Sequence, residues 1–221
     1  MPALRRRAPR GPRRPAEALS AGTNAADTPQ RSTTRLRQLL LIAAAALVAG
    51  AIFLPLWGMT LASVQYPEGL RMIVYPTRLT GDIREINMLN HYIGMIQISD
   101  DFFAELKLLP VFFTVIALAA FGAAFVRRIW ATALPLVLMA GVAVYGFWSM
   151  NRRLHQFGHD LDPMAAMKIE PFTPPMIGEN QIAQFGTYSY FSWGTALPII
   201  AGLLVTAALW LDVHARRTGE L

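Results

Sequence analysis

Four long apolar runs constrain the fold of this 221-residue chain more than any other feature. Each run has few or no charged residues and is close to the ~20 residues that a helix needs to cross ~30 Å of hydrocarbon. The runs cover approximately residues 38–57, 108–126, 129–149 and 191–211. We therefore predict an all-α membrane protein with four transmembrane helices in one membrane domain, residues 38–212.

Tryptophans mark the ends of these runs. Trp57, Trp148 and Trp193 fall at one set of ends, and Trp130 and Trp210 fall at the other. Tryptophan is enriched at membrane–water interfaces, where its ring contacts the apolar layer and its N–H reaches the polar layer. The placement supports the spans and predicts these rings at the two membrane surfaces.

An arginine-rich tail precedes the first run. Residues 1–37 contain nine arginines and only two acidic residues, Glu17 and Asp27. The segment is rich in Arg, Pro, Ala, Ser and Thr and has almost no large apolar side chains, so burial cannot offset the entropy lost on ordering. We predict that residues 1–37 form a disordered cytoplasmic tail.

Basic clusters predict the orientation. Arg127-Arg128 links the second and third runs, and Arg216-Arg217 follows the fourth. Lys and Arg near spanning helices stay in the cytoplasm, so the tail and both clusters belong on the same side. Both termini, including residues 213–221, are therefore predicted to be cytoplasmic, and loops 58–107 and 150–190 are predicted to face outward.

The first outer loop carries signs of local structure. Residues 65–70 (QYPEGL) are typical of a turn, and residues 72–75 resemble a short β-strand. Asp82 and Glu85 have the spacing of a capping box, which predicts a helix that starts at Asp82. Its apolar stripe predicts an amphipathic helix at the outer membrane surface or packed on the helix ends. The stripe consists of Ile86, Leu89, Ile93 and Ile96.

The second outer loop begins with a continuation of the third helix. We expect that helix to reach Phe157, with Gly158 as its stop signal. His155 and His159 would share a face only if the helix were unbroken. Asp162-Pro163 then resembles a helix start that would give a single turn. Arg152-Arg153 is the one basic pair on the outer side.

Composition excludes several classes of function. The chain has no cysteine, so disulfides, thiolate metal sites and cysteine nucleophiles are absent. The net charge of +6 arises in the tail, which has no aromatic side chains for stacking on bases, so nucleic acid is not an expected partner. No nucleophile elbow, phosphate-binding loop, zinc-protease or dinucleotide motif occurs, so we predict a non-enzymatic role.

Histidine and methionine are concentrated in the predicted outer loops. Imidazole and thioether groups bind copper, especially Cu(I), when cysteine is absent. The candidate metal ligands are His91, Met95, His155, His159, Met164 and Met167. The alternative is that the methionines fill gaps in an apolar core and the histidines are ordinary loop residues. Spacing alone favours this alternative, because no tight MxxM-type repeat with histidine occurs in a single helix.

Three strings carry a family resemblance: residues 65–70 (QYPEGL), 86–95 (INMLNHYIGM) and 158–163 (GHDLDP), the last continuing to 174–178 (PPMIG). Over residues 38–212 the chain resembles poorly characterised bacterial four-span membrane proteins encoded near nitrous oxide reductase and its copper-maturation factors. The resemblance implies the bacterial cytoplasmic (inner) membrane, and it strengthens the copper interpretation. It assigns no residue a role.

Two functional hypotheses follow. The first is a membrane accessory protein that handles copper, or assists assembly of a copper-dependent respiratory enzyme such as nitrous oxide reductase, through an outer cap built from both loops. Its partner would be a periplasmic copper protein or respiratory complex. The second is a structural subunit of a respiratory or electron-transfer complex that binds no metal.

Overall fold

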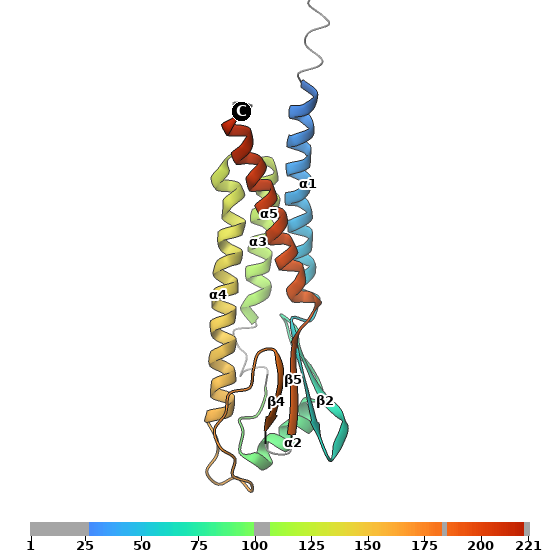
Figure 1. The fold of residues 1–221 in the computed structure, drawn as a ribbon, viewed down its shortest axis with the longest axis vertical. Coiled ribbons are helices and arrows are strands. Elements are labelled where there is room, and N and C mark those ends of the chain that lie inside the picture. Colours follow the sequence, from blue (N-terminus) through green and yellow to red (C-terminus); the bar gives the residue numbers. More distant parts are fainter. Residues whose placement is uncertain (1–26, 100–106, 183–184, 219–221) are drawn as a thin grey trace, which may run out of the picture.

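The computed structural model describes residues 27–99, 107–182 and 185–218. The long helices lie side by side, with a small sheet and a short helix at one end (Figure 1). The long helices are α1 (Asp27–Ala51), α3 (Leu109–Phe125), α4 (Ile129–His159) and α5 (Trp193–Arg217). The start of α1 and the end of α5 lie at the end of the bundle away from the sheet (Figure 1).

Three of the described helices are long and apolar enough to cross a membrane, which indicates a membrane protein. They are α4, α5 and the Ser32–Ala51 part of α1. Helix α3 is equally apolar but has 17 residues. At about 1.5 Å per residue it covers about 25 Å, which is less than the ~30 Å of a typical hydrocarbon layer. The run predicted as a further span therefore forms a helix that is shorter than this layer.

The prediction of an all-α fold is wrong, because the described loop residues form a five-stranded antiparallel sheet. Its strand order is β3-β2-β1-β5-β4. The strands are β1 (Trp57–Ser63), β2 (Tyr66–Val74), β3 (Leu79–Gly81), β4 (Gly178–Ile182) and β5 (Phe185–Phe191). Central strand β1 pairs with β2 on one side and with β5 on the other, so both loops contribute to one sheet.

Helix α2 (Ile83–Ile93) confirms the helix expected in the first loop, but its surroundings differ from the prediction. Ile86 and Ile93 are buried in the apolar core beneath the sheet rather than at a membrane surface. The Asp82 side chain makes no hydrogen bond to the helix; its Oδ2 accepts one from the Arg71 backbone N–H of β2 at 2.8 Å. The capping box is therefore replaced by a contact that fixes the start of α2 to the sheet.

We use the name cap for β1 to β5, α2 and the connecting residues 94–99 and 160–177. The cap and the helix bundle have separate apolar cores. The bundle core is built mainly from small and aliphatic residues, including Leu41, Val48, Ile116 and Val205. The cap core contains larger aromatic and thioether side chains, including Trp57, Met59, Met72 and Phe185.

Helix α4 joins the two regions without a break. It continues to His159, so the prediction that Gly158 stops it is wrong. Gly158 instead allows the backbone of Phe172 to approach the helix closely, because a Cβ at Gly158 would meet the Phe172 carbonyl oxygen. The Phe172 N–H donates to the Gly158 carbonyl at 3.1 Å. The last turns of α4 are thus packed against the cap.

Four of the five tryptophans are exposed at the two ends of the bundle. Trp130 and Trp148 are eighteen positions apart on α4, and Trp193 and Trp210 are seventeen apart on α5. These intervals correspond to about 25–27 Å of helix, close to the thickness of the hydrocarbon layer. Trp57 departs from the prediction: it is buried in β1, and its Nε1 donates to the Met176 carbonyl at 2.8 Å.

At the end of the bundle away from the cap, a buried arginine connects the long helices. The predicted disordered tail included Arg37, whereas the structure places residues 27–37 in α1 and leaves residues 1–26 outside its description. Arg37 Nε lies 2.6 Å from Asp212 Oδ1 of α5, at an angle outside hydrogen-bond geometry, so the contact is an ion pair. Arg37 Nη2 donates to Thr132 Oγ1 of α4 at 2.8 Å and to the Ala123 carbonyl of α3 at 2.9 Å.

This arrangement has a physical reason. The last carbonyls of a helix have no partners within that helix, and an apolar environment offers no water to replace them. The Arg37 guanidinium supplies donors to the end of α3, and Asp212 balances its charge. One side chain of α1 therefore contacts the other three long helices.

Candidate functional site

His155 and His159 form the most distinct pair among the six predicted ligands. They lie one turn apart on the exposed end of α4, with ring centroids 3.8 Å apart and ring planes within 7°. His159 Nδ1 is 3.0 Å from the His155 carbonyl oxygen. When Nδ1 carries the proton it donates to that carbonyl, and the lone pair of Nε2 is then available to a metal.

The stacked arrangement limits what this pair binds without movement. Parallel rings direct their nitrogens side by side rather than toward a common point, so one of the rings must rotate before both imidazoles can bind a single ion. Both side chains are exposed, and rotation about their side-chain bonds meets little resistance. Two imidazoles at this spacing on one helix face are a known way to hold a metal.

His91 lies on the exposed face of α2. It lines a shallow surface hollow together with Arg84, Asn87, Met88 and Gln97, and none of the other predicted ligands lines that hollow. Because α2 ends at Ile93 and Gly94 adopts φ +78°, the chain turns before Met95. His91 and Met95 therefore do not continue along one helical face, as their spacing of four suggested.

Met95 and Met167 are brought together in the cap core. Met95 is buried, and Met167 is partly buried against the same apolar cluster. The second loop reaches this position through backbone hydrogen bonds to the end of α2, from the Asp162 N–H to the Gly94 carbonyl at 2.8 Å and from the Met167 N–H to the Tyr92 carbonyl at 3.2 Å. The structure gives these two methionines a packing role.

Met164 is separate from them and is 88% exposed. Its backbone N–H donates to Asp162 Oδ1 at 2.8 Å, which is the geometry of an Asx turn. The segment after Asp162-Pro163 forms a single hydrogen-bonded turn, in which the Ala165 N–H donates to the Asp162 carbonyl at 3.1 Å, and no helix follows it.

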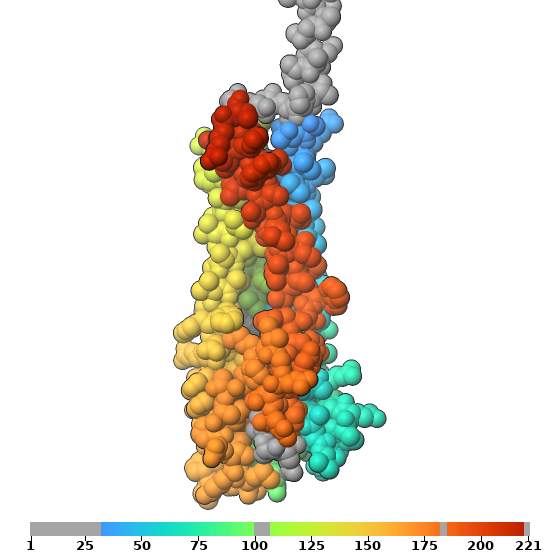
Figure 2. Space-filling view, in the orientation of Figure 1, coloured from blue at the N-terminus to red at the C-terminus, as the bar shows by residue number. Residues whose placement is uncertain are grey.

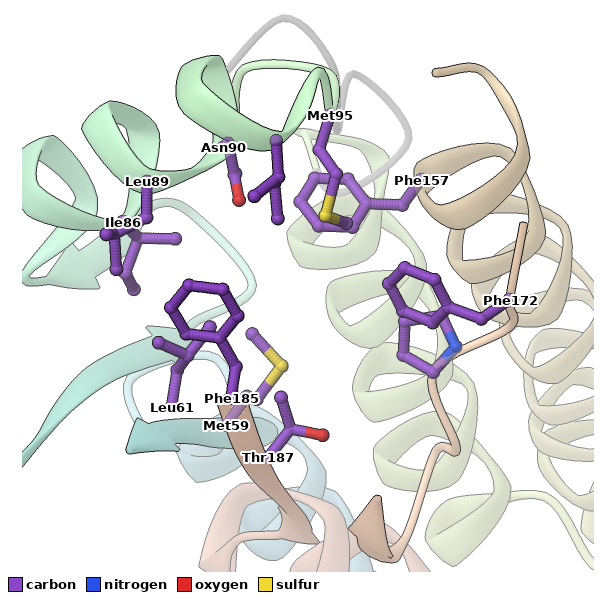
Figure 3. A pocket seen from close by; sticks show the side chains of 12 residues that line it. Met59, Leu61, Ile86, Leu89, Asn90, Met95, Phe157, Phe172, Phe185 and Thr187 are labelled. Carbon is purple, nitrogen blue, oxygen red and sulfur yellow. The ribbon is translucent and has the colours of Figure 1, made fainter. Parts of the chain in front are cut away.

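A small cavity of about 30 Å³ lies inside the cap. Figure 3 shows Met59 and Phe185 of the sheet facing Ile86 and Met95 from the opposite wall. The polar groups around it are few. One is the buried Asn90, whose Nδ2 is 3.4 Å from the Ile96 carbonyl. The space is comparable to one water molecule and is lined mainly by apolar groups, so it is a packing gap rather than a substrate pocket.

A much larger cavity, which sequence analysis missed, lies between the long helices directly beneath the cap. Its volume is about 530 Å³, and its lining is almost entirely apolar. The wall on α4 includes Ala140, Ala143 and Gly146. The sequence signal for this cavity is a series of small residues spaced three apart along one helix. Such residues leave a space beside the helix that larger side chains would fill.

The donor set fits a copper ion only in part. Within the described ranges there is no group of three or more His, Asp or Glu side chains arranged to hold a metal. Of the six predicted ligands, His155 and His159 share a surface, Met95 and Met167 share a core, and His91 and Met164 lie exposed on other segments. Two imidazoles alone leave coordination positions for ligands from elsewhere.

Comparison with known proteins assigns no family. No protein-family model matches this chain, and no curated protein matches it.

Proposed function

We propose that this chain is a non-enzymatic membrane accessory protein that handles copper on the outer face of the bacterial inner membrane. The observation that carries the proposal is the exposed, stacked pair His155 and His159 at the free end of α4. Imidazole is a copper ligand, and an incomplete ligand set suits transient binding and transfer more than storage. The resemblance to proteins encoded near nitrous oxide reductase supports the choice of copper and of a copper-dependent respiratory partner.

The proposed orientation places the cap outside and both termini in the cytoplasm, with α3 as a fourth, shorter span. It is supported by the distribution of basic residues, because Arg127, Arg128, Arg216 and Arg217 lie at the helix ends remote from the cap. A hydrophobic helix shorter than the bilayer is accommodated by local thinning and by packing against its neighbours. In this orientation the histidine pair faces the periplasm.

Copper titration of the purified full-length protein tests the proposal. The protein in detergent is titrated with Cu(II), and separately with Cu(I) against a competing chelator. We expect about one copper ion per chain and loss of binding when His155 and His159 are both replaced by alanine. His214→Ala is the matched control, because His214 stacks on Trp210 at the opposite end of the bundle. Absence of copper binding, or equal binding by the double variant, would contradict the proposal.

The second candidate is a structural subunit that docks a periplasmic partner without metal. The burial of Met95 and the packing of Met167 favour it, because two of the six potential ligands are explained by the cap core. Crosslinking in native membranes distinguishes the candidates. A partner that is captured equally by the wild type and by the double histidine variant, in a protein that binds no copper, supports the structural subunit.

A further inference from the structure

A small polar hollow lies at the end of the bundle remote from the cap. It is formed where three segments meet, namely the first turns of α1, the link between α3 and α4, and the last turns of α5. Figure 2 shows α5, in red, next to α4, in yellow, and α1, in blue, at this end of the molecule. We call this space the basic hollow. Its polar lining consists of Thr33, Thr34, Arg37, Arg127, Asp212 and Arg216.

The basic hollow has an excess of positive charge, because three arginines and one carboxylate line it. The carboxylate belongs to Asp212, which forms an ion pair with the buried Arg37 at 2.6 Å. Among the residues that the structure describes, Arg127 and Arg216 form no ion pair. Arg127 Nη2 donates to Thr34 Oγ1 at 3.4 Å, which is a long contact to a neutral group. Two positive charges at the basic hollow therefore have no negative partner within the described protein.

Orientation in the membrane does not by itself explain this arrangement. Each basic pair at this end contributes one arginine to the lining and leaves the other outside it. Arg127 and Arg216 line the basic hollow, whereas Arg128 and Arg217 do not. The bias that keeps basic residues in the cytoplasm depends on their number near the helix ends and not on a shared position. The convergence of one arginine from each pair therefore indicates a binding site for a negative group.

The basic hollow lies near the depth of the lipid headgroups. Trp130 is three positions from Arg127, and Trp210 is six positions, or about 9 Å of helix, from Arg216. Tryptophan marks the membrane–water interface, and the headgroup layer adds roughly 5–8 Å to each side of the hydrocarbon. The arginines that line the basic hollow are thus within reach of headgroups.

The size of the basic hollow limits its ligand. Its volume is about 30 Å³, which is comparable to the space of one water molecule. A single oxygen of a larger group fits inside, and the rest of the ligand must lie outside. This geometry suits a group that is attached to a larger molecule at the protein surface.

Phosphate is the negative group that a bilayer offers at this depth. A guanidinium binds it through charge-assisted hydrogen bonds that are often bidentate. Basic pockets between spanning helices are a recognised way to bind the headgroups of anionic lipids. We propose that the basic hollow holds the headgroup phosphate of one anionic phospholipid, bound by Arg127 and Arg216, while the acyl chains of that lipid stay in the bilayer.

Native mass spectrometry of the full-length protein tests the proposal. The protein in detergent is titrated with phosphatidylglycerol and with phosphatidylcholine that carries the same acyl chains. The test variant combines Arg127→Gln with Arg216→Gln. The matched control combines Arg128→Gln with Arg217→Gln, which removes the same number of charges from the same two basic pairs but none from the basic hollow.

We expect the wild type and the control variant to prefer phosphatidylglycerol, and the test variant to lose this preference. A hydrogen bond between charged groups is worth roughly tenfold or more in affinity, so the preference should be at least of that size. Thermal unfolding establishes that both double variants are folded. Equal binding of the two lipids by the wild type, or equal effects of the two double variants, would overturn the proposal.

A conservative variant keeps the test decisive if the glutamine variant does not fold. Arg127→Lys combined with Arg216→Lys retains both charges but removes the paired donors of the guanidinium groups. It should bind phosphatidylglycerol more weakly than the wild type does. Affinity equal to that of the wild type would overturn the assignment of the two guanidinium groups.

Inorganic phosphate distinguishes a lipid from a free ion. An excess of it should not displace phosphatidylglycerol, because a free ion lacks the attachment of the lipid to the bilayer or detergent layer. Retention of inorganic phosphate in place of the lipid would overturn the lipid as the source of the phosphate. Copper titration of the same variants should be unchanged, since His155 and His159 lie at the opposite end of α4, so this proposal and the one on the histidine pair can fail separately.

Discussion

The two ends of the helix bundle are held together in different ways. At the end remote from the cap, the single side chain of Arg37 contacts α3, α4 and α5 through an ion pair and hydrogen bonds. At the cap end, the helices lead into a sheet, and an apolar cleft of about 530 Å³ lies between the long helices. One end is closed by polar contacts between helices, and the other is covered by a second apolar core.

The two ends differ because different backbone groups need hydrogen-bond partners at each of them. Near the remote end the final carbonyls of α3 need donors, and a guanidinium provides several in a fixed geometry. At the cap end, backbone groups that follow α1 and precede α5 pair with the sheet and with one another, as in the hydrogen bond from the Ser192 N–H to the Leu56 carbonyl at 2.9 Å. The cap can therefore hold the helix ends while leaving space between them.

The largest effect is expected from Arg37→Met, which breaks the closed end. It leaves Asp212 without its charge partner and several backbone carbonyls without donors. Removing one partner of a buried pair costs about 3–5 kcal/mol, so we expect a fall of that size in the free energy of unfolding. Thermal and denaturant unfolding in detergent measure it.

Two further variants test whether the loss of stability in Arg37→Met comes from the broken ion pair. Arg35→Met removes an exposed charge two positions away and should change stability by no more than about 0.5 kcal/mol. The double variant Arg37→Met with Asp212→Leu should recover part of the loss, because no unpaired charge remains. A loss from Arg35→Met equal to that from Arg37→Met would contradict the role of the ion pair.

A smaller and local effect is expected from Ile86→Ala, which removes a fully buried side chain from the cap core. Large-to-small changes in a core cost about 2–5 kcal/mol. Because the cap and bundle cores are separate, proteolysis should become faster in the cap while the long helices stay protected. Met88→Ala, on the exposed face of the same helix, is the control and should have little effect. Equal loss of protection in both regions would show that the cores unfold together.

The smallest effect is expected from Asp82→Ala, which removes the acceptor for the Arg71 backbone N–H. The loss should be about 1 kcal/mol, and it would appear as faster hydrogen exchange at Arg71. Glu85→Ala provides the comparison. If a capping box stabilised α2, both substitutions would expose its first turn equally, whereas a contact to β2 predicts that Asp82→Ala alone affects the strand.

The long helices could be predicted from the sequence because their signal is local. Runs of about 20 apolar residues gave α3, α4 and α5 to within a few residues at most ends, and the Asp82 start of α2 was found from its position before an apolar stripe. The N-terminal end of α1 was missed because Arg37 resembles part of a charged tail. Only the distant residues Thr132 and Asp212 show that its charge is accommodated inside the bundle.

The sheet was missed for a different reason. In β1 the alternating inward residues begin at Trp57, directly after an apolar helix, so the strand merged with the predicted span. In β5 the buried face carries Thr187 and Ser189, which do not give an apolar alternation. Strand pairing between residues more than a hundred positions apart leaves no local signal of its own.

The candidate metal site was predicted from residue types. The type of a residue does not determine the direction in which its side chain points. His155 and His159 lie together because α4 continues through Gly158, which sequence analysis took as a stop. Met95 turns into the core because Gly94 adopts a left-handed conformation that ends α2. Neither position has room for a side chain, because a Cβ at Gly158 would meet the Phe172 carbonyl and a Cβ at Gly94 would meet the Ala165 side chain.

The unbroken path of α4 has a kinetic consequence. The helix is buried near its start, at Ala131, Thr132 and Pro135, and again near its end, at Leu154 and Gly158, with no described residue buried between these groups. Between these groups α4 packs on the bundle core only through partly buried side chains such as Leu138 and Met139, and there it borders the cleft. Separation of α4 from its neighbours there breaks only these partly buried contacts, so we expect local opening on a timescale much shorter than that of unfolding.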